Sequence, residues 1–382
     1  MERFLSMLYF GLMLSLLSCQ CENPSGVTEK KYDNKVVWSY PILEGFGDLT
    51  KPVINDGKAF IPSNSILICA RLADGKKLWQ IDLGGHLASE DVLYDNGSIY
   101  LVLSDKILCF NAASGEKIWE TLPSDFIAQS LSTISQTQTY LFIGGNNGKT
   151  VKISKSTGSV DLIFLLTQLI WNGYTQSARH PVASTSDNYL YIPTGWWTGE
   201  ELRGNLLCFN SETGEYLWGY ETTEKDASIL GCAISDSIIV FPSGQSMIAL
   251  NRFSGKKIWN VKIVDDAFWW NPTIINGTVY MGSSAKGKMY AFDLRTGEIK
   301  WISEETPSSI ITLITVQDGK VFFCNNSRIY VLNAYTGKTI WWGHPPEHDK
   351  DGVSTYSSPV AVGEGYMVNV GSSKVYCLKV TN

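Results

Sequence analysis

The sequence lacks the features by which several functional classes are recognised. It has no excess of basic residues, since 31 Lys and Arg stand against 37 Asp and Glu for a formal net charge of −6. It has only four histidines, and its eight cysteines include neither a Cys-x-x-Cys pair nor Cys/His spacings typical of zinc. These absences argue against nucleic-acid binding and against a metal site. No amphipathic helical pattern follows the first 18 residues, which argues against a helical or α/β fold.

Long apolar runs are also scarce, and the longest is at the N-terminus. The uncharged stretch FLSMLYFGLMLSLL (Phe4 to Leu17) has about the length of a signal-peptide core and is short for a membrane-spanning helix. It ends in Leu-Leu-Ser-Cys, which resembles a bacterial lipobox. We therefore predict a lipoprotein signal peptide at 1–18, a lipid anchor on Cys19 and a flexible tether at 19–35. A plain secretory signal and an uncleaved anchor are the alternatives. Gln20 favours the outer over the inner membrane of a bacterial envelope.

What the sequence has in abundance is glycine, with 34 residues, together with 13 tryptophans and 18 tyrosines. A motif of the form Thr/Ser/Asp-Gly-x-x-x-Trp recurs, as in TGEIKW at 296–301 and TGKTIW at 336–341. Its glycine falls at 75, 115, 158, 214, 255, 297 and 337, with gaps of 40 to 43 residues and a single gap of 56. This period is typical of the blades of a propeller.

Each repeat reads as four short strands. A β-rich run ends in Asn or Asp before the motif, and two-residue hairpin signals such as Asn276-Gly277 lie further upstream. The isolated Trp38 precedes the first motif tryptophan by one period, whereas the C-terminus has three strands of a blade and no motif. We therefore predict an all-β, eight-bladed propeller at 36–382, closed by pairing Val36–Tyr40 with Val375–Val380.

The motif residues are assigned to this scaffold. Glycine permits the positive φ that ends the turn, and the tryptophan fills the gap between blades with its indole N–H bonded to backbone. The cysteines at 69, 109, 208 and 377 share one repeat position and are predicted to be buried thiols. The structural set is Gly75, Trp79, Gly115, Trp119, Gly214, Trp218, Gly255, Trp259, Gly297, Trp301, Gly337 and Trp341.

The pattern [AS]xx[DN]xxTGxxxW resembles the PQQ-like β-propeller repeat over residues 36–382, and the layout is closest to BamB-like outer-membrane assembly lipoproteins. Leu162 departs from the pattern because it stands where a tryptophan is expected. Quinoprotein dehydrogenases share the repeat. The resemblance implies that such an enzyme would stack PQQ between a Trp and a disulfide of adjacent cysteines, with Ca²⁺ on Glu, Asn and Asp. The sequence has no Cys-Cys pair, so we predict neither PQQ nor enzymatic activity.

Loops that lead into the innermost strand of each blade converge on the axis of a propeller and could form a ligand mouth. The alternative is that they are ordinary polar loops. The candidate residues are Asp48, Glu90, Gln129, Arg179, His180, Trp270, Asn271 and Tyr356.

Blade 4 carries the non-repetitive stretch TGWWTGEELRGN at 194–205, which we predict to be a loop where most blades have a tight turn. Paired tryptophans outside the repeat could contact a protein or a glycan, or could cap the blade. The candidate partner-binding residues are Trp196, Trp197, Glu200 and Arg203. The His and Asp residues of HPPEHDKDG (344–352) are predicted to lie in a solvated loop without regular structure, rather than to bind a metal.

The favoured function is a lipid-anchored, non-enzymatic and monomeric propeller that binds envelope proteins, similar to BamB in outer-membrane protein assembly. The alternatives are a PQQ-dependent oxidoreductase and a surface glycan-binding lipoprotein that uses the paired tryptophans.

Overall fold

The computed structural model describes residues 36–42, 50–124, 128, 133–145, 148–165, 177–178, 181–184, 186–197, 200–222, 229–310, 312–325 and 327–380. The predicted signal peptide, Cys19 and the tether lie outside these residues. Within them, no helix has the length and apolar character needed to cross a membrane.

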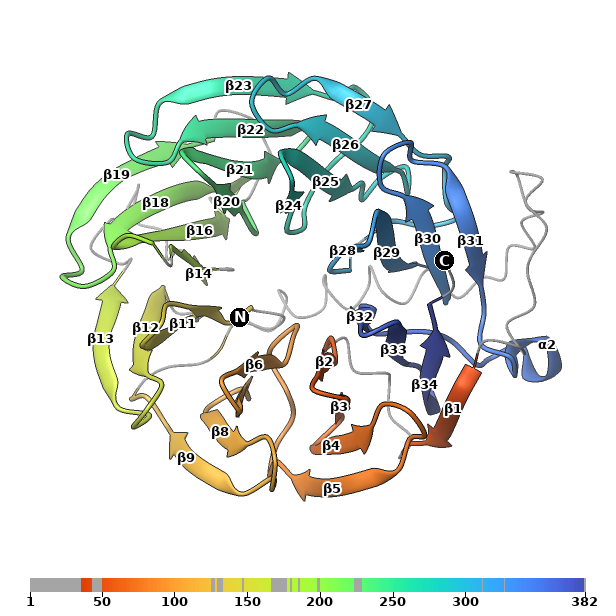
Figure 1. Ribbon diagram of the computed structural model, residues 1–382. Coiled ribbons are helices and arrows are strands. Elements are labelled where there is room, and N and C mark those ends of the chain that lie inside the picture. The colour runs from red at the N-terminus through yellow and green to blue at the C-terminus, as the bar shows by residue number, and fades with distance from the viewer. Residues whose placement is uncertain are drawn as a thin grey trace.

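Eight antiparallel sheets form a closed ring around a central axis, as predicted (Figure 1). Seven sheets have four strands, and the sheet of blade 4 has six. The strands of blades 1 to 4 are β2 (Val53–Asn55), β3 (Lys58–Ser63), β4 (Ile66–Arg71) and β5 (Lys77–Asp82); β6 (Leu93–Asp95), β7 (Ser98–Val102), β8 (Ile107–Asn111) and β9 (Lys117–Thr121); β10 (Ser135–Gln136), β11 (Tyr140–Gly144), β12 (Lys149–Ser154) and β13 (Val160–Leu165); β14 (Ser177–Ala178), β15 (Val182–Ala183), β16 (Tyr189–Trp197), β17 (Leu202–Arg203), β18 (Asn205–Asn210) and β19 (Tyr216–Glu221).

The second half of the chain repeats the arrangement. Its strands are β20 (Ala233–Ser235), β21 (Ile238–Ser243), β22 (Ser246–Asn251) and β23 (Lys257–Lys262); β24 (Thr273–Ile275), β25 (Thr278–Gly282), β26 (Met289–Asp293) and β27 (Ile299–Ile302); β28 (Thr315–Gln317), β29 (Lys320–Asn325), β30 (Arg328–Asn333) and β31 (Thr339–Gly343); β32 (Ala361–Gly363), β33 (Tyr366–Val370), β34 (Lys374–Lys379) and β1 (Val36–Pro41). The first strand of each blade lies nearest the axis and the last forms the rim (Figure 1).

The ring closes between the two ends of the chain. Strand β1 pairs antiparallel with β34, with Val36 opposite Leu378 and Pro41 opposite Lys374 (Figure 1). Trp341 of blade 7 packs in the same apolar cluster as Val36 and Val380. The predicted closure is confirmed, and it pairs an edge that would otherwise be open.

A tryptophan on the last strand of one blade packs on the turn of the next blade. A Cβ added to Gly337 of blade 7 would lie 2.4 Å from Cε3 of Trp301 of blade 6, so this position has no room for a side chain. The indole N–H of Trp301 donates to the carbonyl of Ala334 at 2.9 Å. The same bond to the same repeat position is formed by Trp38, Trp79, Trp119, Trp218 and Trp259. The predicted role of the motif is confirmed.

In five of the seven motifs an Asn or Asp forms the turn, and Arg71 and Ser154 occupy this position in blades 1 and 3. In blade 7 the side-chain oxygen of Asn333 accepts hydrogen bonds from the backbone N–H groups of Tyr335 at 2.9 Å and Thr336 at 3.0 Å. Gly337 follows with φ of +70°, a conformation that favours glycine. Local sequence chemistry therefore sets the geometry on which the neighbouring tryptophan packs.

We refer to the boundary between two consecutive blades as a seam, so that seam 3–4 separates blades 3 and 4. At this seam Leu162 replaces the tryptophan and still contacts the turn glycine, since a Cβ on Gly214 would lie 3.1 Å from its Cδ2. Lys152 is buried beside it, with Nζ 2.8 Å from Glu212 of blade 4 and 3.2 Å from Asp161. Burial alone would lower the pKa of Lys152, but the hydrogen bonds to Glu212 and Asp161 outweigh it and raise the pKa. An ion-pair cluster thus accompanies the smaller apolar contact.

The four cysteines of the repeat position are buried, and each lies opposite the tryptophan of its own blade, as Cys69 does opposite Trp79. Burial raises the pKa of the Cys69 thiol to about 11. All six cysteines within the described residues are free thiols. They pack as small apolar side chains, as the sequence predicted.

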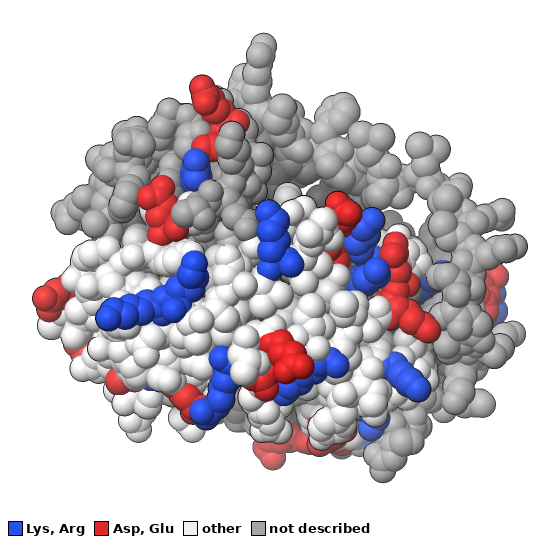
Figure 2. Space-filling view, turned by 90° about the horizontal axis from the view of Figure 1, so that it is seen from above, with Lys and Arg blue, Asp and Glu red and all other residues white. Residues whose placement is uncertain are grey.

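The rim presents charges of both signs. Figure 2 shows the rim from the side that is uppermost in Figure 1, and basic and acidic side chains are interspersed on it. Pairs such as Lys117 with Glu120 on β9 and Lys300 with Asp293 in blade 6 are of this kind. Such a mixed surface fits the small negative net charge.

The loop from 344 to 352 differs from the prediction, because it contains one turn of helix, α2 (His348–Asp351). The imidazole rings of His344 and His348 stack with centroids 3.8 Å apart, and Arg328 donates to Nε2 of His344. Burial, with Arg328 and His348 nearby, lowers the pKa of His344 to about 4. Within the described residues no group of three His, Cys, Asp or Glu side chains could hold a metal ion.

Candidate functional site

The candidate site lies where the loops that precede the innermost strands approach the axis; we call these the inner loops. Of the predicted ligand mouth, Glu90, Trp270, Asn271 and Tyr356 lie within the described residues. The other four predicted residues, Asp48, Gln129, Arg179 and His180, lie outside them.

Glu90 and Trp270 face each other across the axis. Glu90 belongs to the inner loop of blade 2 and Trp270 to that of blade 6, and these blades are opposite in a ring of eight (Figure 1). The indole N–H of Trp270 is directed at the Glu90 carboxyl and favours its charged form, but the geometry falls short of a formed hydrogen bond. The inner loops therefore meet at the centre, which the repeat pattern alone does not show.

The surroundings of Glu90 disfavour its charged form. Its side chain is only 3% exposed, and burial, followed by the nearby Asp91, raises its pKa well above 4.5. A carboxyl group in its protonated form donates one hydrogen bond and accepts others, so burial favours the form of Glu90 that can act as a hydrogen-bond donor.

Lys51 and Asp91 form a second polar pair that the sequence analysis did not single out. The inner loops of blades 1 and 2 are joined by a parallel β-bridge between Lys51 and Asp91. The backbone N–H of Lys51 donates to the backbone carbonyl of Glu90 at 2.6 Å. Burial raises the pKa of Asp91 to about 6 despite the attraction of Lys51, and burial lowers the pKa of Lys51. No repeat signal marks either residue, because only the packing of the two loops brings them together.

Several buried polar atoms of the inner loops have no hydrogen-bond partner in the structure. Asn271 packs tightly on Gly231 of blade 5, where a Cβ would lie 1.4 Å from Oδ1. Buried polar atoms are normally bonded to protein or ordered water, so this concentration indicates that a polar molecule or water completes the site. The unpartnered atoms are Ser89 Oγ, Glu90 Oε2, Asp91 Oδ1, Trp270 Nε1, Asn271 Oδ1 and Tyr356 OH.

These residues do not fit a calcium–quinone pair. Burial disfavours the charged form of Glu90, which is the form that binds a divalent cation, and the neighbouring Asp91 raises the pKa of Glu90 further. The six described cysteines are all free, so none of them provides the stacking disulfide. The site has a Trp, a Glu and an Asn, and what they offer is hydrogen bonding.

The candidate partner-binding residues lie on an extended hairpin rather than on a loop, which corrects the prediction. Strand β16 continues through Trp197, and its end pairs with β17, with Trp196 opposite Arg203. Glu200 is exposed, and Arg203 donates to Glu201 through Nε at 2.9 Å. In the sequence, the segments TGWW (194–197) and ELRG (201–204) flank a short connection, and this arrangement is the signal that could have predicted the hairpin.

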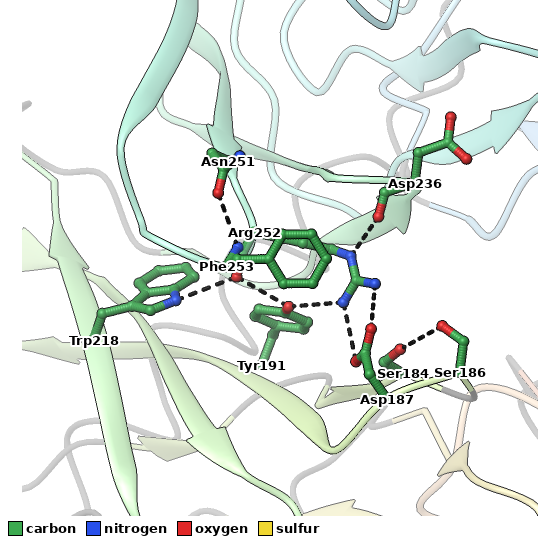
Figure 3. A network of polar contacts seen from close by, with 9 residues as sticks. All are labelled: Ser184, Ser186, Asp187, Tyr191, Trp218, Asp236, Asn251, Arg252 and Phe253. Carbon is green, nitrogen blue, oxygen red and sulfur yellow. Dashed lines mark hydrogen bonds and ion pairs between the residues drawn. The ribbon is translucent and has the colours of Figure 1, made fainter.

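A buried polar network lies at seam 4–5, centred on Arg252 (Figure 3). Its guanidinium is buried and forms an ion pair with Asp187 of blade 4, and Nη1 donates to the hydroxyl of Tyr191 at 3.1 Å. The Arg252 carbonyl accepts from that same hydroxyl at 3.0 Å and from the Trp218 indole at 3.2 Å. Each of these hydrogen bonds or ion pairs joins blade 5 to blade 4. We therefore interpret the network as one that holds the two blades together.

Replacing Glu90 with glutamine is expected to flatten the dependence of stability on pH. The folded-state pKa of Glu90 is raised above 4.5, so its favourable contribution is complete below that value and is lost as pH rises toward the folded-state pKa. Glutamine mimics the neutral form at every pH. Melting temperatures between pH 4 and 8 measure the effect, with the exposed Glu298→Gln as control. Equal slopes for wild type and Glu90→Gln would contradict a buried neutral carboxyl.

The comparisons with known proteins agree with the fold. The family model for outer membrane protein assembly factor BamB matches residues 28–163 and 243–382. The crystal structure of BamB from Moraxella catarrhalis superposes with a TM-score of 0.67 at 14% identity, covering 90% of this chain and 99% of that one. Identity this low shows that the fold is shared and nothing further.

Two curated relatives are enzymes, and they match only parts of the chain. Quinoprotein alcohol dehydrogenase PedH of Pseudomonas putida is 24% identical over 149 residues, which are 35% of this chain and 24% of that protein. Tetrathionate hydrolase of Acidithiobacillus ferrooxidans is 23% identical over 239 residues, or 54% of this chain and 46% of the enzyme. The chain thus spans less than half the length of the curated relatives that it matches.

Proposed function

The chain belongs to the PQQ-like propeller family described as outer membrane protein assembly factor BamB, and from this premise we propose that it is a non-enzymatic binding and scaffold protein of the bacterial envelope. Its partners are proteins that take part in outer-membrane protein assembly. A lipid on Cys19 anchors it to the membrane. The observation that carries this proposal is the family match, which covers residues 28–163 and 243–382.

The extent of the sequence matches supports the same role. The family model covers residues 28–163 and 243–382, whereas the two curated enzymes are matched over only 24% and 46% of their own lengths. The inner loops add a chemical reason, because burial disfavours the charged form of Glu90 that would bind the cation of a quinone site. The oxidoreductase alternative therefore has less support.

Exposed apolar side chains indicate where a protein partner could bind. The loops that connect the rim strand of one blade to the innermost strand of the next all lie on one face of a propeller, because the four strands are antiparallel. Among the described residues, three of the four most exposed large apolar side chains are in these loops: Leu122 at 63%, Val264 at 73% and Val353 at 71%. Trp269 is half exposed in the same loop as Val264, and exposed aromatic and aliphatic groups together are typical of interaction sites.

The double variant Val264→Ser/Trp269→Ala is expected to reduce partner recovery at least about tenfold, since loss of a few apolar anchors commonly costs 1–3 kcal/mol of binding free energy. The full chain, with its own signal peptide and a C-terminal tag, is crosslinked in its native host, and the recovered proteins are identified by mass spectrometry.

Leu78→Ser/Ile118→Ser on the rim is the matched control, since both side chains are exposed but face outward from β5 and β9. Recovery of an outer-membrane assembly protein by the wild type and the rim variant, and its loss in Val264→Ser/Trp269→Ala, would support the proposal. Recovery of no envelope protein by the wild type would contradict it.

A further inference from the structure

A cavity of about 430 Å³ opens at seam 6–7, away from the inner loops. It lies between the hairpin turns at Asn276-Gly277 of blade 6 and Asp318-Gly319 of blade 7, with the corner at Tyr335 beside them. Its volume is within the range found for small-molecule sites.

Two aromatic side chains, Tyr280 and Trp301, form the floor of the cavity and are almost completely buried. The hydroxyl of Tyr280 and the indole N–H of Trp301 both donate to the Ala334 carbonyl, at 3.2 and 2.9 Å. Their polar atoms are thus already bonded, and the rings are packed against each other with centroids 5.9 Å apart. They give the cavity a rigid floor, and the aromatic ring that is open to a ligand is that of Tyr335.

Polar groups surround this surface. Asn276, Gln317 and Asp318 line the cavity from the two turns, and the Gln317 amide reaches Asp318 at 3.4 Å. Lys300 completes the set, with Nζ 2.9 Å from the hydroxyl of Thr278 and 3.3 Å from Asp293. These amide, carboxylate and ammonium groups can together donate to and accept from neighbouring hydroxyls.

The scaffold does not require Lys300. The residue before the tryptophan is aliphatic in six of the eight blades, as at Leu78, Ile118 and Ile258. Lys300 departs from this rule where the cavity lies, and it extends the polar rim. The other exception, Asp161, is explained by its ion pair with Lys152.

Tyr335 is the most exposed of the large apolar side chains within the described residues, at 78%. Its ring lies over the β28–β29 turn of the same blade, since a Cβ on Gly319 would be 3.0 Å from Cε2. The same corner position is occupied by the small residues Ala73, Ala113 and Ser156 in three blades, and by Glu212, Phe253 and Arg295 in three others. An exposed tyrosine is therefore not needed to form the corner, and it extends the aromatic surface to solvent.

Among the described residues, seam 6–7, like seam 5–6, lacks the charged bridge that crosses three other seams. Lys155 pairs with Asp95 across seam 2–3, Lys152 with Glu212 across seam 3–4, and Arg252 with Asp187 across seam 4–5. No ion pair between described side chains crosses seam 6–7. Without such a bridge the groove between the two turns stays open to a ligand.

We propose that seam 6–7 binds a saccharide. A pyranose ring has an apolar C–H face that packs on an exposed aromatic ring such as that of Tyr335, and a rim of hydroxyls that pair with amides and carboxylates. A phosphorylated ligand fits less well because Asp318 lines the cavity and Asp293 neutralises Lys300. The site is separate from the inner loops and from the proposed protein-binding face.

Titration calorimetry tests the proposal with glucose, galactose, mannose, N-acetylglucosamine and their oligomers of up to four units. We expect saturable binding of at least one of these at about millimolar affinity or tighter. Tyr335→Ala and Gln317→Ala should each weaken that binding at least tenfold without changing the melting temperature.

Phe253→Ala is the matched control, because Phe253 occupies the same corner position in blade 5 and is 43% exposed. It should bind the saccharide within a factor of two of the wild type. The proposal is overturned if no saccharide binds saturably, or if Tyr335→Ala binds as tightly as Phe253→Ala. Binding of the same strength by both variants would show an interaction elsewhere on the surface.

Discussion

Replacing Gly337 with alanine is expected to destabilise the propeller by about 3–5 kcal/mol, or to prevent its folding. Two costs combine: φ at this position is +70°, which disfavours a side chain by about 1–2 kcal/mol, and the new Cβ would lie 2.4 Å from the Trp301 ring. The tryptophan is wedged between two sheets and has little room to move. Urea unfolding followed by tryptophan fluorescence measures the change in unfolding free energy.

Gly277→Ala separates these two costs. Gly277 has nearly the same φ, +71°, but a Cβ there would have no atom within 4 Å. It should therefore show the conformational cost alone, about 1–2 kcal/mol. If Gly277→Ala and Gly337→Ala were equally destabilising, the contact between blades would contribute nothing and the wedge interpretation would be wrong.

Replacing Arg252 with alanine is expected to cost about 3–5 kcal/mol, the usual penalty for removing one partner of a buried ion pair. The change leaves Asp187 and Tyr191 without their partner at seam 4–5 (Figure 3). Arg252→Lys keeps the positive charge, but a lysine cannot form hydrogen bonds to the Asp187 carboxylate and to the Asp236 carbonyl at the same time. We therefore expect an intermediate loss of unfolding free energy. Thermal or urea unfolding compares the three proteins.

A double-mutant cycle with Asp187→Asn measures the pair itself. Hydrogen bonds from Arg252 outweigh the effect of burial and lower the pKa of Asp187 below 3.8. Its contribution is therefore present above pH 3.8 and is lost as pH falls through the lowered pKa. The difference between wild type and Arg252→Ala should accordingly shrink in acid. Additive effects of the two substitutions would show that the ion pair contributes no coupling energy.

The candidate site was predictable only in part. Spacing within the repeat placed Glu90 and Trp270 in inner loops, since each precedes an innermost strand by a few residues. It could not show that blades 2 and 6 bring them face to face, or that Lys51 lies beside Asp91. These contacts join residues far apart in the sequence, and no local pattern records them.

The same distinction applies to the seams. Leu162 was visible as a departure from the motif, but the buried ion pair of Lys152 with Glu212 that accompanies it joins residues 60 positions apart. Nothing in the sequence marks Lys300 or Tyr335 as a candidate binding residue. Only the structure shows that both of them line a cavity between two hairpin turns.

The sequence by itself determined the architecture: the strands, the turns, the number of blades and the closure of the ring. This was possible because each of these depends on chemistry within one repeat, namely the Asn or Asp that bonds the turn, the glycine with positive φ and the tryptophan four residues later. Tertiary structure alone decided where polar side chains meet at the axis and which residues line a cavity between two blades. Those features arise from contacts between repeats, and a ring of eight similar units brings together residues that no periodic pattern relates.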